Sequence, residues 1–296
     1  MQKIIIFGVG CAGRAMHRKF LEEAIYDVIG FIDNNDKIVD NNYKGLPIYS
    51  AKKAKELECD LFVISGVWAD EMEKQLIDIG IDKNKILILE EKHITHSTPL
   101  REKNTDSLIK RIDEYLCKNN IKYFISGSAF LAALRGKPLS TASDVDLNVT
   151  NYEDLVFLSQ NLKNTFKDLD IKTLYLKEDL VTRKANEISR IAITNNIGEL
   201  EDRAMIDIGI FEEYGDYRIQ NYDNGKYFYM NNNIFDNFTR IKYKDFYINA
   251  LAKYDEYLTN LYGKNYIEIP NRFSANNYPN LVDKQTLEKM YNHTKQ

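Results

Sequence analysis

The 296-residue sequence lacks the patterns of cysteine, histidine, apolar and basic residues that are typical of several protein classes. Its three cysteines and four histidines show neither the spacing of a disulfide framework nor that of a zinc site. No uninterrupted apolar run reaches the roughly 18–20 residues of a membrane-spanning helix. The net charge is −4, so the basic excess typical of nucleic-acid-binding proteins is also missing. We therefore expect a cytoplasmic protein with reduced cysteines, no transmembrane segment and no nucleic-acid partner; self-association into a homo-oligomer is left open.

The N-terminal part of the chain alternates apolar strand-like segments with helix-like segments, which is typical of a parallel, doubly wound α/β sheet. The pattern predicts four strands, over residues 3–10, 26–34, 59–66 and 84–91. We predict a Rossmann-like nucleotide-binding domain over residues 1–92, a linker over 93–104 that contains Pro99, and a second, mixed α/β domain over 105–296. Within that second domain we expect a helix from about residue 105, capped by Asn104 or Thr105, and another over about 243–262, ended by Gly263.

The first predicted strand runs into a G-x-G-x-x-G turn made by Gly8, Gly10 and Gly13, and Asp33 follows at the end of the second strand. In dinucleotide-binding folds such glycines let a phosphate approach the helix N-terminus, and the acidic residue meets a ribose hydroxyl. We predict that a nucleotide binds there. Because only four strands are expected, we favour a mononucleotide or nucleotide-sugar over NAD; the alternative is a Rossmann-like turn that binds nothing.

A resemblance extends over residues 3–90, through the "GFID" segment that ends at Asp33 and through Gly45-Leu46-Pro47-Ile48-Tyr49. These segments resemble the small nucleotide-binding domains that precede sugar-modifying enzymes of capsule and surface-glycan pathways. The resemblance does not specify a ligand.

Two aspartates, Asp144 and Asp146, lie one residue apart in a segment that otherwise reads as a β-strand. Alternation along a strand places both carboxylates on one face, where like charges repel and a divalent cation would offset the repulsion. Gly127 and Ser128 precede them, between a strand and a short helix, and Asp207 interrupts a later apolar run. The alternative is a solvated strand whose aspartates lie at the surface and a strand-end Asp207.

The succession of helix, strand, Gly-Ser, short helix and S-D-x-D-L resembles the nucleotidyltransferase superfamily. Together with "GSAFLAALRGK" and the ending L-x-x-x-Y-G-x-x-Y-x-x-x-P, it looks like the LicD-type phosphotransferase family, which includes phosphorylcholine transferases and fukutin-like ribitol-phosphate transferases. The resemblance spans about residues 107–272. It departs from the family pattern at Thr141-Ala142-Ser143, where the family usually has a denser acidic run.

The resemblance implies a set of site residues. Gly127 and Ser128 would hold a phosphate and Arg135 would bind the donor phosphate. Mg²⁺ (or Mn²⁺) would be held by Asp144, Asp146 and Asp207. Arg183, Lys184 and Arg190 are further basic candidates, and nothing in their spacing selects one.

The implied activity is transfer of a phospho-alcohol, phosphocholine or an alditol-phosphate, from a CDP-linked donor to a surface glycan. Three alternatives stay open. They are a true nucleotidyltransferase that releases pyrophosphate, a nucleotide-sensing regulatory protein and, ranked last, a nicotinamide-dependent oxidoreductase.

Overall fold

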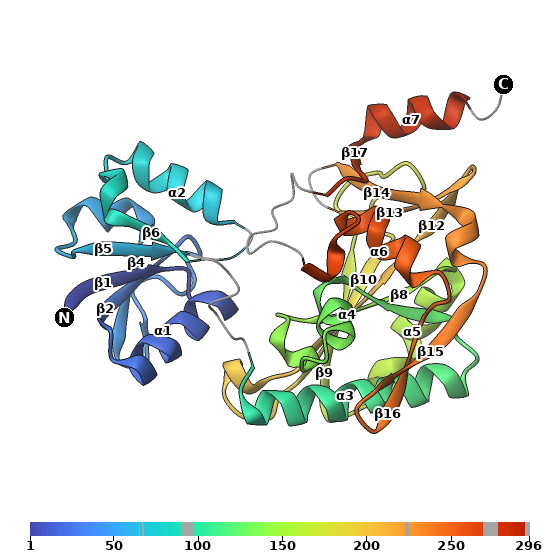
Figure 1. Cartoon of the computed structure of the whole chain (residues 1–296), viewed down its shortest axis with the longest axis horizontal. Helices are drawn as coiled ribbons and strands as arrows, with labels where there is room; N and C mark the ends of the chain where they lie inside the picture. Colours follow the sequence, from blue (N-terminus) through green and yellow to red (C-terminus); the bar gives the residue numbers. More distant parts are fainter. Residues whose placement is uncertain (65, 67, 90–96, 223–224, 269–277, 294–296) are drawn as a thin grey trace. The chain divides into compact units, whose positions relative to one another are not determined.

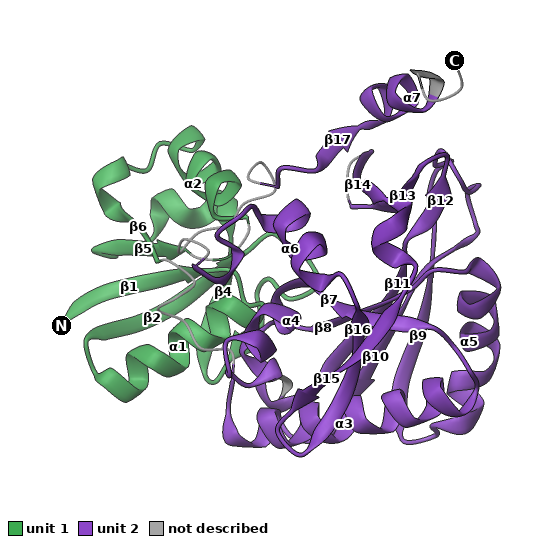
Figure 2. Ribbon diagram, turned by 45° about the vertical axis from the view of Figure 1, so that its right-hand side comes forward, with its two compact units in different colours: residues 1–96, 270–274 green, residues 97–269, 275–296 purple. Residues whose placement is uncertain are grey.

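The computed structural model describes residues 1–64, 66, 68–89, 97–222, 225–268 and 278–293. The chain forms two compact units, unit 1 with residues 1–96 and 270–274, and unit 2 with residues 97–269 and 275–296 (Figure 2). Each unit has α-helices and its own β-sheets, and in the described residues no sheet joins strands of both units (Figure 1). The predicted α/β fold class, with a Rossmann-like sheet followed by a mixed α/β domain, is confirmed.

Unit 1 is built on a six-stranded sheet in the order β3-β4-β2-β1-β5-β6. Every neighbouring pair is parallel except β3 and β4. The strands are β1 (Gln2–Phe7), β2 (Tyr26–Asp33), β3 (Asn42–Tyr43), β4 (Leu46–Ser50), β5 (Leu61–Ile64) and β6 (Ile86–Ile88). The helical segments are α1 (Cys11–Glu23), η1 (Ala51–Glu56), α2 (Ala69–Asp78) and η2 (Lys83–Lys85).

Alternation along β1 explains why both faces of this sheet are covered. Ile4 and Ile6 belong to the core that includes Phe20 of α1, whereas Ile5 and Phe7 belong to the core that includes Leu76 of α2. A parallel sheet buried on both faces needs such apolar runs, and "KIIIF" supplies one.

The predicted number of four strands is wrong. β4 pairs in parallel with β2, so the parallel strands β4, β2, β1, β5 and β6 extend to both sides of β1. The prediction missed β4 because Pro47 lies inside it, and proline lacks the N–H that a central strand needs. The preference for a mononucleotide or nucleotide-sugar over NAD rested on a sheet of only four strands. The structure therefore removes the reason for that preference.

The main sheet of unit 2 has five strands in the order β7-β8-β11-β10-β9, and its one parallel pair is β8 with β11. The strands are β7 (Tyr123–Ser126), β8 (Val145–Val149), β9 (Leu169–Tyr175), β10 (Ile188–Asn195) and β11 (Met205–Ile210). A second sheet contains β12 (Glu212–Tyr214), β13 (Tyr217–Asn221), β14 (Lys226–Asn231) and β17 (Leu281–Asp283), and a hairpin contains β15 (Phe238–Tyr243) and β16 (Phe246–Leu251).

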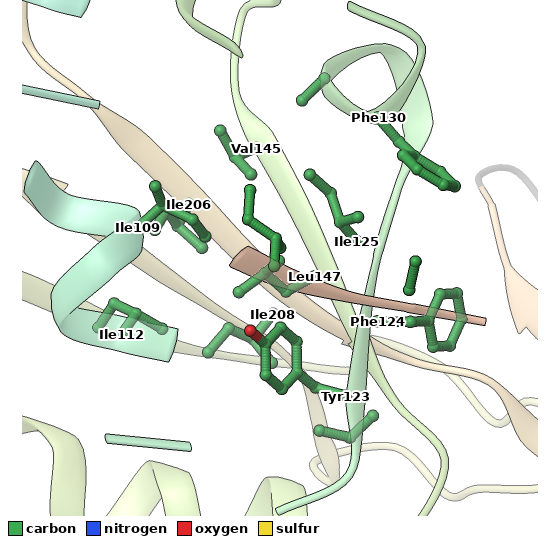
Figure 3. Close-up of a cluster of buried hydrophobic side chains, with 14 of the residues drawn as sticks. Ile109, Ile112, Tyr123, Phe124, Ile125, Phe130, Val145, Leu147, Ile206 and Ile208 are labelled. Atoms are coloured by element: carbon green, nitrogen blue, oxygen red, sulfur yellow. The ribbon is translucent and has the colours of Figure 1, made fainter. Parts of the chain in front are cut away.

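The α-helices of unit 2 are α3 (Pro99–Lys118), α4 (Gly127–Leu134), α5 (Tyr152–Thr165), α6 (Tyr254–Tyr262) and α7 (Lys284–His293). Short 3₁₀ turns are η4 (Leu139–Thr141), η5 (Leu200–Asp202), η6 (Asn232–Phe235) and η7 (Tyr266–Glu268). In the core of unit 2, Ile109 and Ile112 of α3 pack against the apolar face of the main sheet, which includes Leu147 and Ile208 (Figure 3).

Two expected boundaries in unit 2 are wrong. The predicted linker over 93–104 ends early, because α3 begins at Pro99 with Thr98 as its N-cap, whose Oγ1 accepts a hydrogen bond from the Arg101 N–H at 2.9 Å. Proline is favoured in the first turn of a helix, where its missing N–H costs nothing. Asn104 and Thr105 are buried within the helix and are not its caps. Residues 93–96 lie outside the described residues.

The helix expected over 243–262 is also only partly present. Residues 243–251 belong to the β15–β16 hairpin, which turns at Lys244 with a φ of 51°, and α6 begins at Tyr254. The apolar spacing of Tyr247 and Leu251 fits a helix, but Phe246, Ile248 and Ala250 also alternate as in a strand, and pairing with β15 decides the outcome. The predicted end at Gly263 agrees with the structure, where this glycine has a φ of 91°.

The three cysteines Cys11, Cys59 and Cys117 are free. In the described part of the chain, no helix combines the length and the apolar character that crossing a membrane requires.

Candidate functional site

Two carboxylates meet on the parallel strands at the centre of the unit 2 sheet. Asp146 of β8 and Asp207 of β11 are direct register partners. Neighbouring strands lie about 4.8 Å apart and paired residues point to the same face, so these side chains are neighbours. Val145 and Leu147 point to the opposite face and are buried in the core. The strand alternation that the sequence predicted around Asp146 is present.

The turn that begins α4 lies against the Asp146 carboxylate. Gly127 has a φ of +66°, and a Cβ built on it would lie 2.4 Å from Asp146 Oδ2. Any side chain at this position would displace the carboxylate, so only glycine fits. β7 pairs with β8 along the edge opposite β11, and its Ser126 is the register partner of Asp146 and the N-cap residue of α4. Ser128 is exposed in the first turn of α4.

The carboxylates at this site are held together against their mutual repulsion. Burial raises the pKa of Asp146 well above its usual value, and the negative charges of Asp144 and Asp207 raise it further. Burial also raises the pKa of Asp207; Arg190 partly lowers it and Asp144 adds to the increase. Asp144 lies just before β8, where the Ser143 hydroxyl donates a hydrogen bond to its Oδ1 at 2.7 Å.

Arg190 is the basic residue that the structure brings to this site. It extends from β10, and its Nε lies 3.4 Å from Asp207 Oδ2. Its side chain is 56% exposed, so it has room to move toward a ligand. The other two basic candidates pair elsewhere: Arg183 with Glu212, and Lys184 with Asp179. The sequence named Arg190 only as one of three, because the strand pairing that selects it is a tertiary feature.

The donor atoms suit a hard divalent cation. Asp207 Oδ1 is buried and accepts no hydrogen bond from the described residues. Burial is the main cause of the raised pKa values of Asp146 and Asp207, so a cation at this point would stabilise their ionised forms. Mg²⁺ is commonly held by one or two carboxylates plus substrate phosphates, a requirement that Asp146 and Asp207 meet. In the described residues, however, no group of three or more His, Cys, Asp or Glu side chains is arranged to hold a metal ion by itself. A cation here would depend on oxygen atoms from a substrate.

Arg135 lies at the C-terminal end of α4 and is engaged with the protein. Its Nη2 donates to the backbone oxygen of Tyr266 at 2.7 Å, its Nε is buried without a hydrogen bond, and burial lowers its pKa. This contact fastens η7 to α4. The predicted role of Arg135 in binding a donor phosphate stays a prediction.

Behind the carboxylates lies a buried polar chain that the sequence interpretation did not identify as functional. Asn148 donates to Ser126 Oγ at 2.7 Å and accepts a hydrogen bond from Gln220 at 2.6 Å. Tyr257 also hydrogen-bonds the Ser126 side chain. Asn148 follows Asp146 at strand spacing, which was the one signal in the sequence.

In unit 1 the glycine turn after β1 has the expected close packing. Gly8 has a φ of +96°, and a Cβ on Gly13 would lie 1.8 Å from the Gly8 carbonyl oxygen, whereas a Cβ on Gly10 would contact none of the described residues within 4 Å. Asp33 accepts hydrogen bonds from the Val9 and Asn35 N–H groups, each at 2.8 Å. Asp33 therefore holds this turn in place, and its contact with a ribose stays a prediction.

Comparison with known proteins gives one family match. A family model described as C2185-like, N-terminal, matches residues 1–87, which lie within unit 1. No curated protein matches the sequence.

Three solved structures illustrate the similarities found. The lincosamide antibiotic adenylyltransferase LnuA, bound to lincomycin, is 16% identical, with a TM-score of 0.34 over 55% of this chain and 96% of that protein. A nucleotidyltransferase-like antigenic protein from Paracoccidioides brasiliensis is 12% identical, with a TM-score of 0.32 over 50% of this chain and 61% of that protein. The Rex-family repressor RSP is 14% identical, with a TM-score of 0.26 over 40% of this chain and 61% of that protein. TM-scores this low carry no inference about function.

Proposed function

We propose that unit 2 is a divalent-cation-dependent transferase that moves a phospho-alcohol, phosphocholine or an alditol-phosphate, from a CDP-linked donor to a glycan hydroxyl. The observation that carries the proposal is the register pairing of Asp146 with Asp207, with Gly127 closed against the Asp146 carboxylate. The LicD-type sequence resemblance favours a CDP-alcohol as the donor.

Each residue at the site has a distinct role in this proposal. Asp144, just before β8, Asp146 on β8 and Asp207 on β11 would hold Mg²⁺ together with oxygen atoms of the donor; when bound, Mg²⁺ supplies positive charge to the donor diphosphate. A donor phosphate would approach the first turn of α4, where Ser128 is exposed. Arg190 would leave Asp207 and pair with a donor phosphate, because guanidinium matches phosphate oxygens well.

The reaction forms one bond and breaks one bond at phosphorus. The glycan hydroxyl oxygen bonds to the phosphorus of the phospho-alcohol as the bond between that phosphorus and the bridging oxygen of the diphosphate breaks, and CMP leaves. The hydroxyl proton passes to Asp207, whose Oδ1 accepts no hydrogen bond from the described residues. Positioning and charge stabilisation account for most of the catalysis in this reaction class.

Product analysis tests the proposal. The full-length protein is incubated with Mg²⁺, a glycan acceptor and CDP-choline, CDP-ribitol or CDP-glycerol, and in parallel with nucleoside triphosphates. Release of CMP that is lost in Asp146→Asn supports phospho-alcohol transfer. Release of pyrophosphate overturns it in favour of nucleotidyl transfer, and absence of both products in the wild type overturns it in favour of a regulatory protein.

For unit 1 we propose nucleotide binding at the Gly8–Gly13 turn. The support is the open space at Gly10 and the strand order with β1 at the centre of the parallel strands, the arrangement in which ligands bind beyond the carboxyl ends of the strands. Calorimetry with NAD, mononucleotides and nucleotide-sugars tests this proposal, and failure of all three classes to bind would refute it.

A further inference from the structure

The N-terminal end of α3 carries three buried polar side chains. Arg101 is 3% exposed, Asn104 is 5% exposed and Thr105 is 3% exposed. Burying a guanidinium or an amide is costly unless its hydrogen bonds are made inside the protein. The hydrogen-bond partners of Arg101 and Asn104 therefore indicate which segments this end of the helix holds.

Arg101 bonds to the segment that immediately precedes Asp144. Its Nη2 donates to the backbone oxygen of Ala142 at 3.3 Å, and also to that of Ser143. One guanidinium thus holds two successive carbonyls, and the next residue is Asp144. Ser143 in turn donates its hydroxyl to Asp144 Oδ1. Nearby, the Ser97 and Ser140 hydroxyls lie 2.6 Å apart, which ties the chain before α3 to η4.

The N-terminal end of α3 also holds the segment that leads into β11. Thr98 Oγ1 donates to Asp202 Oδ1 at 2.7 Å, and Asn104 Nδ2 donates to the backbone oxygens of Asp202 at 2.8 Å and Ile197 at 3.3 Å. Gly198 has a φ of +80°, and a Cβ there would lie 2.9 Å from Asp202 Cβ, so this loop is closely folded. Asp207 follows five residues after Asp202 along the chain.

We propose that the N-terminal end of α3 is a positioning element for the carboxylate site, with Arg101 fixing Asp144 and with Thr98 and Asn104 fixing the approach to Asp207. This inference rests on the proposed function. The two loops come from distant parts of the chain, and the N-terminal end of α3 bonds to both. The segments that lead into β8 and β11 are thereby fixed from outside the site, in the way that outer contacts orient metal ligands elsewhere.

The experiment compares Arg101→Gln and Arg101→Lys with Arg111→Gln as a matched control. Arg111 lies on the same helix and pairs with Asp168 at the surface. Backbone hydrogen exchange is measured over residues 142–147, together with Mg²⁺ affinity in the presence of CDP-choline and the kcat and KM for turnover. In Arg101→Gln we expect faster exchange at 142–144, Mg²⁺ affinity about 10-fold weaker and kcat about 10–100-fold lower, with KM for the acceptor unchanged. Arg101→Lys, which keeps the charge and one donor, should recover part of each loss, and Arg111→Gln should resemble the wild type.

The proposal would be overturned if a folded Arg101→Gln protein had the same hydrogen-exchange rates over residues 142–147 and the same Mg²⁺ affinity as the wild type. If that variant does not fold, Arg101→Lys decides, since it should fold and show the same changes to a smaller degree; wild-type behaviour in it would overturn the proposal as well. A wild-type protein that neither binds Mg²⁺ nor turns over would refute the proposed function. The exchange comparison would still show whether Arg101 orders the segment before Asp144.

Discussion

Asp146 and Asp207 face each other as register partners on the parallel strands β8 and β11, although 60 residues separate them in the sequence. Asp207 is buried and Asp146 is half-buried, so their carboxylates repel each other at this spacing, and Asp144 adds a third negative charge. One cation, Arg190, partly offsets them through Asp207. The native fold therefore maintains an electrostatic cost at this point, and sites that do so are candidates for function.

Removing one charge should relieve this cost. We expect Asp146→Asn to make the metal-free protein more stable by about 1 kcal/mol at pH 7, because the raised pKa of Asp146 shows that its ionised form destabilises the fold. Turnover should fall by several orders of magnitude. Urea unfolding without divalent cations measures the stability change. Asp168→Asn is the control with the opposite sign, since hydrogen bonds from Arg111 lower the Asp168 pKa and the change removes them.

The stability gap between the wild type and Asp146→Asn should depend on pH. A carboxyl whose folded pKa is raised binds more protons in the folded state than in the unfolded state, so the wild type loses stability as pH rises above the unfolded value of about 3.9. The gap should be absent below that pH, grow until the folded pKa is passed, and then stay constant. A gap that shrinks with rising pH would contradict the electrostatic account.

Gly127 and Gly136 provide a matched pair of substitutions in and beside α4. Both have a φ of +66°, but a Cβ at Gly127 would meet Asp146 Oδ2 at 2.4 Å, whereas one at Gly136 would contact nothing within 4 Å. Gly136→Ala should cost about 1–2 kcal/mol for the backbone conformation alone and keep activity. Gly127→Ala should cost more and abolish turnover. Chemical denaturation and the CMP assay on both variants check this, and equal behaviour of the two would refute the close contact.

Arg190 should have opposite effects on cation binding and on turnover. In Arg190→Gln, Mg²⁺ no longer competes with the guanidinium for Asp207. Because the arginine side chain is largely exposed, the gain in Mg²⁺ affinity should be roughly 2–5-fold. Turnover should nevertheless fall, since the donor phosphate loses a partner. Calorimetric titration with Mg²⁺ and steady-state kinetics measure the two effects, and weaker Mg²⁺ binding in the variant would show that Arg190 does not compete with the cation.

In unit 1, Gly10 and Gly13 should respond differently to alanine. Gly13→Ala would force a Cβ against the Gly8 carbonyl, so we expect unit 1 to be destabilised or unfolded. Gly10 has a φ of −74° and open space around it, so Gly10→Ala should fold normally and lose nucleotide binding. Thermal melts and nucleotide titrations separate the two effects. A Gly10→Ala protein that binds nucleotide as the wild type does would place the ligand elsewhere.

The sequence predicted those features that local pattern determines. The alternation around Asp146 placed its carboxylate opposite Val145 and Leu147, and the G-x-G-x-x-G turn, the short helix after Gly127 and the helix end at Gly263 lie where the residues indicated. These features depend on strand alternation and on backbone conformations that only glycine adopts readily.

Features that depend on long-range pairing escaped prediction. β4 was not predicted because Pro47 lies inside it, and the residues of β16 form a strand because they pair with β15, although their apolar spacing also fits a helix. Arg190 could not be selected among the basic residues without knowing that β10 lies beside β11. Arg101 lay inside the predicted linker, so its bonds to Ala142 and Ser143 had no signal in the sequence.

In the proposed mechanism, Asp146 and Asp207 share one divalent cation with a nucleotide donor. A crystal of the full-length protein grown with Mn²⁺ and CDP-choline, with data collected at the manganese absorption edge, would show whether they do. We predict an anomalous peak between the two carboxylates, about 2.0–2.2 Å from an oxygen of each and from a donor phosphate oxygen, with Arg190 turned away from Asp207. Donor density without a peak at this position, and with Arg190 still paired to Asp207, would contradict the claim.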